Sequence, residues 1–594
     1  MVLQTIDMVI IAAFFVLSLL IGLYASKQAG KSSADFFLSG RSMPWWLLGT
    51  SMVATTFSCD TPNLVTDIVR QYGVAGNWVW WAFLLTGMMT VFIFAKLWSR
   101  SRIMTDLEFY EFRYSGNIAA FLRGFRALYL GFLFNILIMA TVSLALMKIG
   151  AALLSWSPVK TMLIASLITV VYSTFGGLRG IILTDFFQFI ISMIGAVGAA
   201  VILINMPDVG GLEGLLTHPV VSSKLSLLPD FDNWDAVLGL LILPLLVQWW
   251  SVWYPGAEPG GGGYIAQRIL SAKNEKEAVK ATLFFNIVHY AFRPWPWILV
   301  GLASLIIFPD IQSMVDHFPN VDESIIKEDF AYPAMLTFLP NGFVGLVVAA
   351  LIAAYMSTIS THLNWGSSYI VNDFYKRFIQ KNASEKELVV AGRISTVVLM
   401  IFAVIFALLL SNALEAFELI LQIGAGTGLI YILRWFWWRI NAKTELAAMI
   451  ISFLVAVFFV KIYPKLGLPE LSSAVKLLIG VGVTTIGWLI VAFVTEPTDK
   501  EKLKEFYLKV RPGGPGWAHI EKELIAEGKL EGNVYWDVPI SIVAMIVASI
   551  AVYSVLFAFA YWIYFDITKA LIFTVVAVVG FIILSRLWKK LEFK

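Results

Sequence analysis

The sequence predicts an all-α protein that crosses a membrane many times, and three observations predict it. Hydrophobic residues make up 59% of the 594 residues and charged residues 14%, whereas ordinary soluble domains are about half apolar and about a quarter charged. The apolar residues fall in runs of roughly 20, the length that a helix needs to cross a bilayer. The loops between these runs carry the Lys and Arg residues unevenly. Such a composition excludes a soluble enzyme, a disordered chain and a fibrous repeat.

The length rule gives about fifteen spans. Their approximate limits are 6–26, 44–70, 77–98, 125–147, 160–176, 182–206, 236–254, 282–308, 341–371, 391–411, 415–438, 444–463, 473–494, 539–565 and 570–587. The apolar run after the first seven residues is about 19 residues long and no Lys or Arg precedes it, so we expect a retained span and not a signal peptide.

Lys and Arg predict the orientation of these spans. With the N-terminus outside, the cytoplasmic loops carry 33 of these residues and the external loops 9. Positive residues concentrate on the cytoplasmic side of membrane proteins. We therefore expect a plasma (bacterial inner) membrane protein with its N-terminus outside and its C-terminus in the cytoplasm.

Charge and reactive residues point away from nucleic acids and from catalysis. The net charge of +3 is too balanced to suggest a nucleic-acid partner. The one cysteine, Cys59, excludes a disulfide framework and a cysteine-based metal site. The five histidines have no metal-ligand spacing, and the sequence has no GxxxxGK[ST] phosphate loop. We therefore expect a protein that is not an enzyme and does not use ATP.

Two spans carry residues that break helices. Span 44–70 holds a cluster of hydroxyls and one carboxylate that ends at Pro62, and span 236–254 runs into Pro255, Pro259 and the glycines 260–263. Unpaired backbone at membrane depth persists only in protein interiors or beside cavities. Broken helices at matching places are typical of inverted repeats in transporters. The alternative is that Pro and Gly are simply frequent in membrane helices.

The two broken spans predict four parts of the chain, because each of them opens a group of five spans and further helices lie before and after these groups. Residues 1–43 form a leading helix and a cytoplasmic loop, 44–235 a first five-helix repeat, and 236–440 a second, inverted five-helix repeat. Residues 441–594 hold the C-terminal helices and the cytoplasmic loop 496–537.

The span at 341–371 has an unusual density of hydroxyls. Ser357, Thr358, Ser360 and Thr361 lie at its middle, and Ala354, Ser357, Thr358 and Thr361 share one helical stripe. Neutral hydroxyls and freed carbonyls can replace the water around a sodium ion. The alternative is that these hydroxyls only bind neighbouring helices or their own backbone.

Together with the segment YSTFGGLRGIILTDFFQ at 172–188, these features resemble the sodium:solute symporter family over roughly residues 5–465. This family includes the bacterial proline, galactose and sialic-acid sodium symporters. The resemblance implies a leucine-transporter-type fold of two inverted five-helix repeats with one extra leading helix, and here about four more helices at the C-terminus.

The resemblance also implies sodium ligands. In the main site, Ala54, Phe57 and Ala354 would supply carbonyls, and Ser357 and Thr358 hydroxyls. A possible second sodium would use Asp185, Ser360 and Thr361. The alternative for Asp185 is a helix N-cap.

The implied solute site lies beside the two breaks. Arg293 has three possible roles: it could bind a carboxylate, pair with Asp60 or Glu258 in a gate, or pack on Trp295 or Trp297. The expected solute-binding residues are Asp60, Thr61, Trp80, Phe83, Gln248, Trp253, His289, Arg293, Glu418 and Gln422.

The expected function is sodium-coupled import of a small polar solute, most simply a sugar or an organic acid, by a monomer that works by alternating access. Proton coupling through Asp60, His289 or Asp185 is one alternative, and a non-transporting membrane sensor is another.

Overall fold

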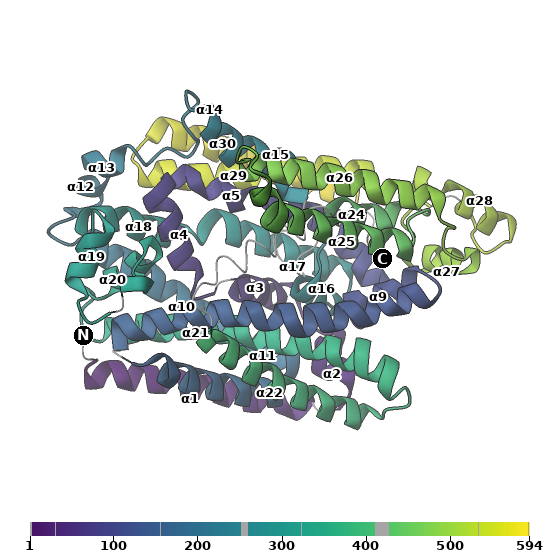
Figure 1. Cartoon of the computed structure of the whole chain (residues 1–594), viewed down its shortest axis with the longest axis horizontal. Helices are drawn as coiled ribbons and strands as arrows, with labels where there is room; N and C mark the ends of the chain where they lie inside the picture. Colours follow the sequence, from purple (N-terminus) through teal and green to yellow (C-terminus); the bar gives the residue numbers. More distant parts are fainter. Residues whose placement is uncertain are drawn as a thin grey trace.

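The computed structural model is helical, as predicted, and describes residues 3–593 except 30, 57, 155, 251–258, 322, 410–426, 533 and 592. Most helices run along one elongated bundle (Figure 1). The N-terminus lies at one end of this bundle, and the C-terminus lies in its other half (Figure 1).

Within the described residues, eleven helical segments are long and apolar enough to cross a membrane. The four remaining predicted spans each have a distinct outcome. Span 44–70 is divided in two, and spans 160–176 and 236–254 correspond to the shorter apolar helices Pro158–Thr174 and Trp234–Leu246. Much of span 415–438 lies outside the described residues.

The first half of the chain contains the first break. Its main helices are α1 (Thr5–Ala29), α2 (Ser33–Leu38), α3 (Trp45–Thr56), α4 (Thr61–Tyr72), α5 (Trp78–Trp81), α6 (Leu84–Met89), α7 (Ala95–Ser101), α8 (Phe109–Arg113), α9 (Asn117–Leu128), α10 (Asn135–Leu154) and α11 (Pro158–Ile204). A π-helical turn at Thr90–Phe94 connects α6 to α7. Gly177, with φ of 55°, bends α11 between the two spans predicted there, a backbone conformation that favours glycine.

The second half contains the second break and the C-terminal helices. Its main helices are α14 (Trp234–Val237), α15 (Leu243–Leu246), α16 (Gly263–Leu270), α17 (Glu275–Ile287), α18 (Trp295–Ile307), α21 (Phe343–Ser368), α22 (Glu385–Leu409), α24 (Gly428–Phe436), α25 (Ala442–Val457), α26 (Ser473–Val494), α27 (Lys500–Val510), α28 (Ala518–Ala526), α29 (Val538–Ile563) and α30 (Ile567–Trp588).

The connecting segments gather at the two ends of the bundle. Short helices α12 (Gly211–Thr217), α13 (Pro219–Ser222), α19 (Ile311–His317) and α20 (Ala331–Leu336) lie at one end, and α27 and α28 lie at the other (Figure 1). The segments expected outside and the loop expected in the cytoplasm are thus at opposite ends.

Helix α21 forms the centre of the fold. It packs against α11, α1 and α10, and every residue from 347 to 368 is buried. A helix that is buried on all sides has no solvent face to hold polar residues. Its hydroxyl groups must therefore find partners inside the protein.

The N-terminus of α21 is fixed by Asp7 of α1. Asp7 is buried, and its Oδ1 accepts hydrogen bonds from the backbone N–H groups of Gly342 at 2.7 Å and Gly345 at 2.8 Å. These donors lie at the start of a helix, where N–H groups lack intrahelical partners and a negative charge is favourable.

We expect Asp7→Ala to lower the free energy of unfolding by about 1–3 kcal/mol, because it leaves buried N–H groups without an acceptor. Asp7→Asn keeps one acceptor oxygen and should lose less. Thermal unfolding of the purified protein in detergent measures both. Equal melting temperatures for Asp7→Ala and the wild type would contradict this role.

Candidate functional site

The predicted break in span 44–70 is confirmed. Helix α3 ends at Thr56 and α4 begins at Thr61. The last four carbonyl groups of a helix have no intrahelical partner, and the C-terminal end of a helix carries a partial negative charge. Two of these carbonyls are bound by other segments of the chain: Val53 accepts from Arg293 at 3.3 Å, and Thr55 accepts from Thr358 at 2.8 Å.

The second predicted break is also confirmed in its described part. Residues 259–262 are not helical, and α16 begins after them at Gly263. The N–H of Gly263 donates to Asp106 Oδ2 at 2.9 Å. All eight residues of α16 are buried, so this short helix returns into the protein.

The hydroxyl stripe of α21 faces the end of α3. Besides the Thr358–Thr55 bond, the Oγ1 atoms of Thr55 and Thr361 are 3.0 Å apart, and Ser357 Oγ donates to Asp185 Oδ1 at 2.7 Å. A hydroxyl that donates its one hydrogen keeps two lone pairs. The oxygens of Ser357 and Thr358 can therefore still bind a cation. Ala54 and Ala354 are buried on the same two helices, and Phe57 lies outside the described residues.

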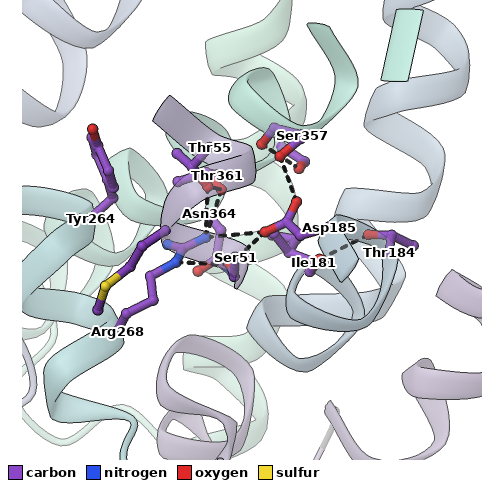
Figure 2. Close-up of polar contacts among 12 residues, drawn as sticks. Ser51, Thr55, Ile181, Thr184, Asp185, Tyr264, Arg268, Ser357, Thr361 and Asn364 are labelled. Carbon is purple, nitrogen blue, oxygen red and sulfur yellow. Dashed lines mark hydrogen bonds and ion pairs between the residues drawn. The ribbon is translucent and has the colours of Figure 1, made fainter. Parts of the chain in front are cut away.

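Asp185 lies inside α11 and not at a helix start, so its interpretation as an N-cap is wrong. Its Oδ2 accepts from Ser51 Oγ at 2.5 Å and lies 3.7 Å from Arg268 Nη2. Arg268 also donates to Thr361 Oγ1 at 2.6 Å. Figure 2 shows Arg268 reaching from its helix to Ser51, Asp185 and Thr361. Ser360 Oγ donates to the Ser357 carbonyl of its own helix at 3.1 Å.

Sequence reasoning missed Arg268. The residue follows the glycines of the second break, and the predicted spans place it in the cytoplasmic loop between 236–254 and 282–308. The available signal was the sequence YIAQRIL at 264–270, in which apolar residues surround Gln267 and Arg268.

A cavity of about 50 Å³ lies between α3, α6, α16 and α17. Two of the predicted solute residues, Phe83 and His289, line it. Besides His289, the polar residues that line it were not predicted, and they are Thr56, Thr86, Thr90, Tyr264, Thr282, Asn286 and Tyr290.

Asn286 is the most informative of these residues. Its side chain is buried, its Nδ2 donates to the Thr282 carbonyl at 2.8 Å, and its Oδ1 has no hydrogen-bond partner in the described part of the chain. Gly87 lies opposite, and a Cβ atom built on it would be 1.7 Å from this Oδ1. Only glycine therefore leaves room for the amide in this position.

The remaining predicted solute residues surround the cavity or lie apart from it. The Trp80 ring stacks on Tyr290 with 5.9 Å between centroids and meets His289 edge-on at 5.8 Å. Asp60 and Thr61 stand at the start of α4. Gln248 is described only in its backbone, and Trp253, Glu418 and Gln422 lie outside the described residues, as does Glu258.

Arg293 packs on an aromatic ring, one of its three predicted roles. Its guanidinium lies 5.2 Å from the centre of the Trp297 ring, in addition to its bond to the Val53 carbonyl. It does not line the cavity described above.

Comparisons with known proteins identify the family of this chain. The model of the sodium:solute symporter family matches residues 36–452. The chain is 28% identical over 473 residues to a sodium/glucose cotransporter of Vibrio parahaemolyticus. The alignment covers 77% of this chain and 85% of that protein. It is 25% identical over 551 residues to sodium/myo-inositol cotransporter 2 of Oryctolagus cuniculus, covering 84% and 78% of the two chains.

A solved structure shows the same fold. It is a Na⁺-coupled sialic acid symporter in a substrate-bound, outward-open state, with a TM-score of 0.67 and 22% identity, covering 84% of this chain and 99% of that one. The predicted resemblance is thus confirmed over more than half of the sequence. The chain is a multi-pass membrane protein that belongs to the sodium:solute symporter family.

Proposed function

We propose that this protein imports a small, uncharged, polyhydroxylated solute together with sodium, by alternating access. Family membership supports sodium-coupled symport. The observation that carries the mechanism is the buried hydrogen bond from Thr358 of α21 to the Thr55 carbonyl at the end of α3, because it brings the hydroxyls of α21 to the point where the carbonyls of α3 lose their helical partners.

In this proposal sodium binds where α3 ends. The carbonyls of Ala54, Phe57 and Ala354 and the hydroxyls of Ser357 and Thr358 are its ligands. Sodium is a hard cation that prefers oxygen, and the negative end of the α3 dipole favours it further. Every ligand is neutral, so no permanent anion needs to be buried with the ion.

The architecture in the proposal is two inverted five-helix repeats within about fifteen spans, with the N-terminus outside, the C-terminus in the cytoplasm and one chain as the working unit. The position of the loops at the two ends of the bundle is consistent with this topology (Figure 1). The repeats move against each other around the fixed ion site.

The cavity favours a solute rich in hydroxyl donors. The hydroxyls of Thr56, Thr86 and Thr90 all donate to backbone carbonyls, of Met52, Trp249 and Thr86 respectively. Their oxygens therefore face the cavity as acceptors, like Asn286 Oδ1. A sugar or polyol can donate to these acceptors, whereas a carboxylate cannot. The glucose and myo-inositol relatives support this choice over an organic acid.

The experiment that tests the function is uptake into proteoliposomes with an inward sodium gradient. Purified protein is first screened by thermal shift against sugars, polyols and organic acids, with and without sodium, to find a solute that stabilises it only with sodium. We expect uptake of this solute to stop when choline replaces sodium. Uptake that continues without sodium and follows a pH gradient would establish proton coupling instead.

Loss of a sodium ligand should weaken sodium binding. We expect Ser357→Ala and Thr358→Ala each to raise the sodium concentration for half-maximal uptake about 10- to 150-fold, since one interaction with a charged ligand is worth about 1.5–3 kcal/mol. The matched control is Ser368→Ala on the same helix, where the hydroxyl donates to the Trp365 carbonyl. Unchanged sodium dependence in both ligand variants would remove this site assignment.

Displacing the Asn286 amide should weaken solute binding. We expect Gly87→Ala to raise the KM for the solute about tenfold, because the new methyl group pushes away an acceptor worth about 1–1.5 kcal/mol. The sodium dependence should stay the same. Gly180→Ala is the control, because a Cβ there would be 3.5 Å from its nearest neighbour, Ala25. Equal KM values in the two variants would exclude Asn286 from the solute site.

A further inference from the structure

The position of the predicted second sodium is occupied by a side chain of the protein. Two of its expected ligands, Asp185 and Thr361, both face the guanidinium of Arg268 (Figure 2). Nη2 of Arg268 lies 2.6 Å from Thr361 Oγ1 and 3.7 Å from Asp185 Oδ2. The residues present therefore do not leave this position open to a free cation.

The charges of this cluster are already balanced. The side chains of Asp185 and Arg268 are both 0% exposed. A buried carboxylate is costly unless it is paired and hydrogen-bonded. Asp185 meets both conditions, because Ser357 and Ser51 donate to its two oxygens and Arg268 supplies the positive charge. A sodium ion added here would be repelled by the guanidinium at short range.

The guanidinium is also held in place. Its Nε donates to Ser51 Oγ at 3.2 Å and its Nη1 to Gln267 Oε1 at 3.0 Å. Gln267 in turn donates to Asn364 Oδ1 of α21 at 2.9 Å. Arg268 therefore cannot leave Asp185 unless α16 moves away from α3 and α21.

We propose that Arg268 acts as a built-in cation at the second ion position, so that the transporter carries one sodium ion per solute. An arginine stays protonated throughout the physiological pH range, and it is part of the chain. It therefore balances Asp185 without contributing to the transported charge. This inference rests on the proposed function and specifies its ion stoichiometry.

The test counts sodium ions in the full-length purified protein and in transport. Binding of radioactive sodium gives the number of sites, and the reversal potential in proteoliposomes gives the number of sodium ions carried per solute. We expect one in both measurements for the wild type. A wild-type value of two would overturn the proposal, and this measurement needs no variant.

Substitution of Arg268 tests whether its positive charge is the reason that only one sodium ion binds. We expect Arg268→Gln to bind two sodium ions, because Asp185 is then free to pair with the second. The double variant Arg268→Gln with Asp185→Asn should return to one. Arg268→Lys, which keeps the positive charge, should stay at one. An Arg268→Gln protein that melts cooperatively but still binds one sodium would overturn the proposal.

Failure here differs from failure of the proposed function. Sodium-independent uptake by the wild type would contradict sodium coupling itself. Sodium-dependent uptake with two ions per solute would leave the coupling intact and would remove only the role assigned to Arg268.

Discussion

The free carbonyl groups at the end of α3 are the constraint on which the rest of the site depends. A helix that ends inside a membrane protein exposes carbonyls where no bulk water can bind them. Two other segments of the chain meet this need, α21 through Thr358 and the segment before α18 through Arg293. This explains why a helix as apolar as α21 carries hydroxyls at its middle. It also explains why its start is fixed by Asp7, since a shift of one residue along its axis would separate Thr358 from Thr55.

The two proposed cation positions differ in charge, and the difference determines what each can do. The ligands proposed for sodium are neutral, so they can hold an ion firmly enough to bind and still release it. The neighbouring position has a full negative charge on Asp185, already balanced by Arg268 at 3.7 Å. A free carboxylate there would hold sodium more strongly. Sodium can therefore bind and leave repeatedly, because its proposed ligands are neutral and the carboxylate beside them is already paired with Arg268.

Sequence reasoning predicted the features that local chemistry determines. Pro62 and the glycines at 260–263 mark the breaks, and helical spacing alone puts Ser357 and Thr358 on one stripe. It could not predict contacts that depend on tertiary packing. Arg268 lies on a helix of eight residues, too short for a span, and the apolar residues around it do not say which partners the helix meets when it returns into the protein. The space for Asn286 depends on Gly87, which is 199 positions earlier in the sequence. The sequence left three roles possible for Arg293. One of its partners is the backbone carbonyl of Val53, and no side-chain pattern indicates such a contact.

The adjacent residues Thr55 and Thr56 connect the proposed sodium site to the proposed solute cavity. Thr55 binds Thr358 and Thr361 of α21, whereas Thr56 lines the cavity and lies 3.3 Å from the Tyr264 hydroxyl. Tyr264 and Arg268 are both on α16, so the end of α3 and this helix are joined on the cavity side and on the ion side. In the proposed mechanism, a sodium ion that orders the end of α3 also orders one wall of the cavity. By linkage, a solute that prefers the ordered wall strengthens sodium binding by the same factor. In this proposal, one turn of one broken helix couples the two ligands.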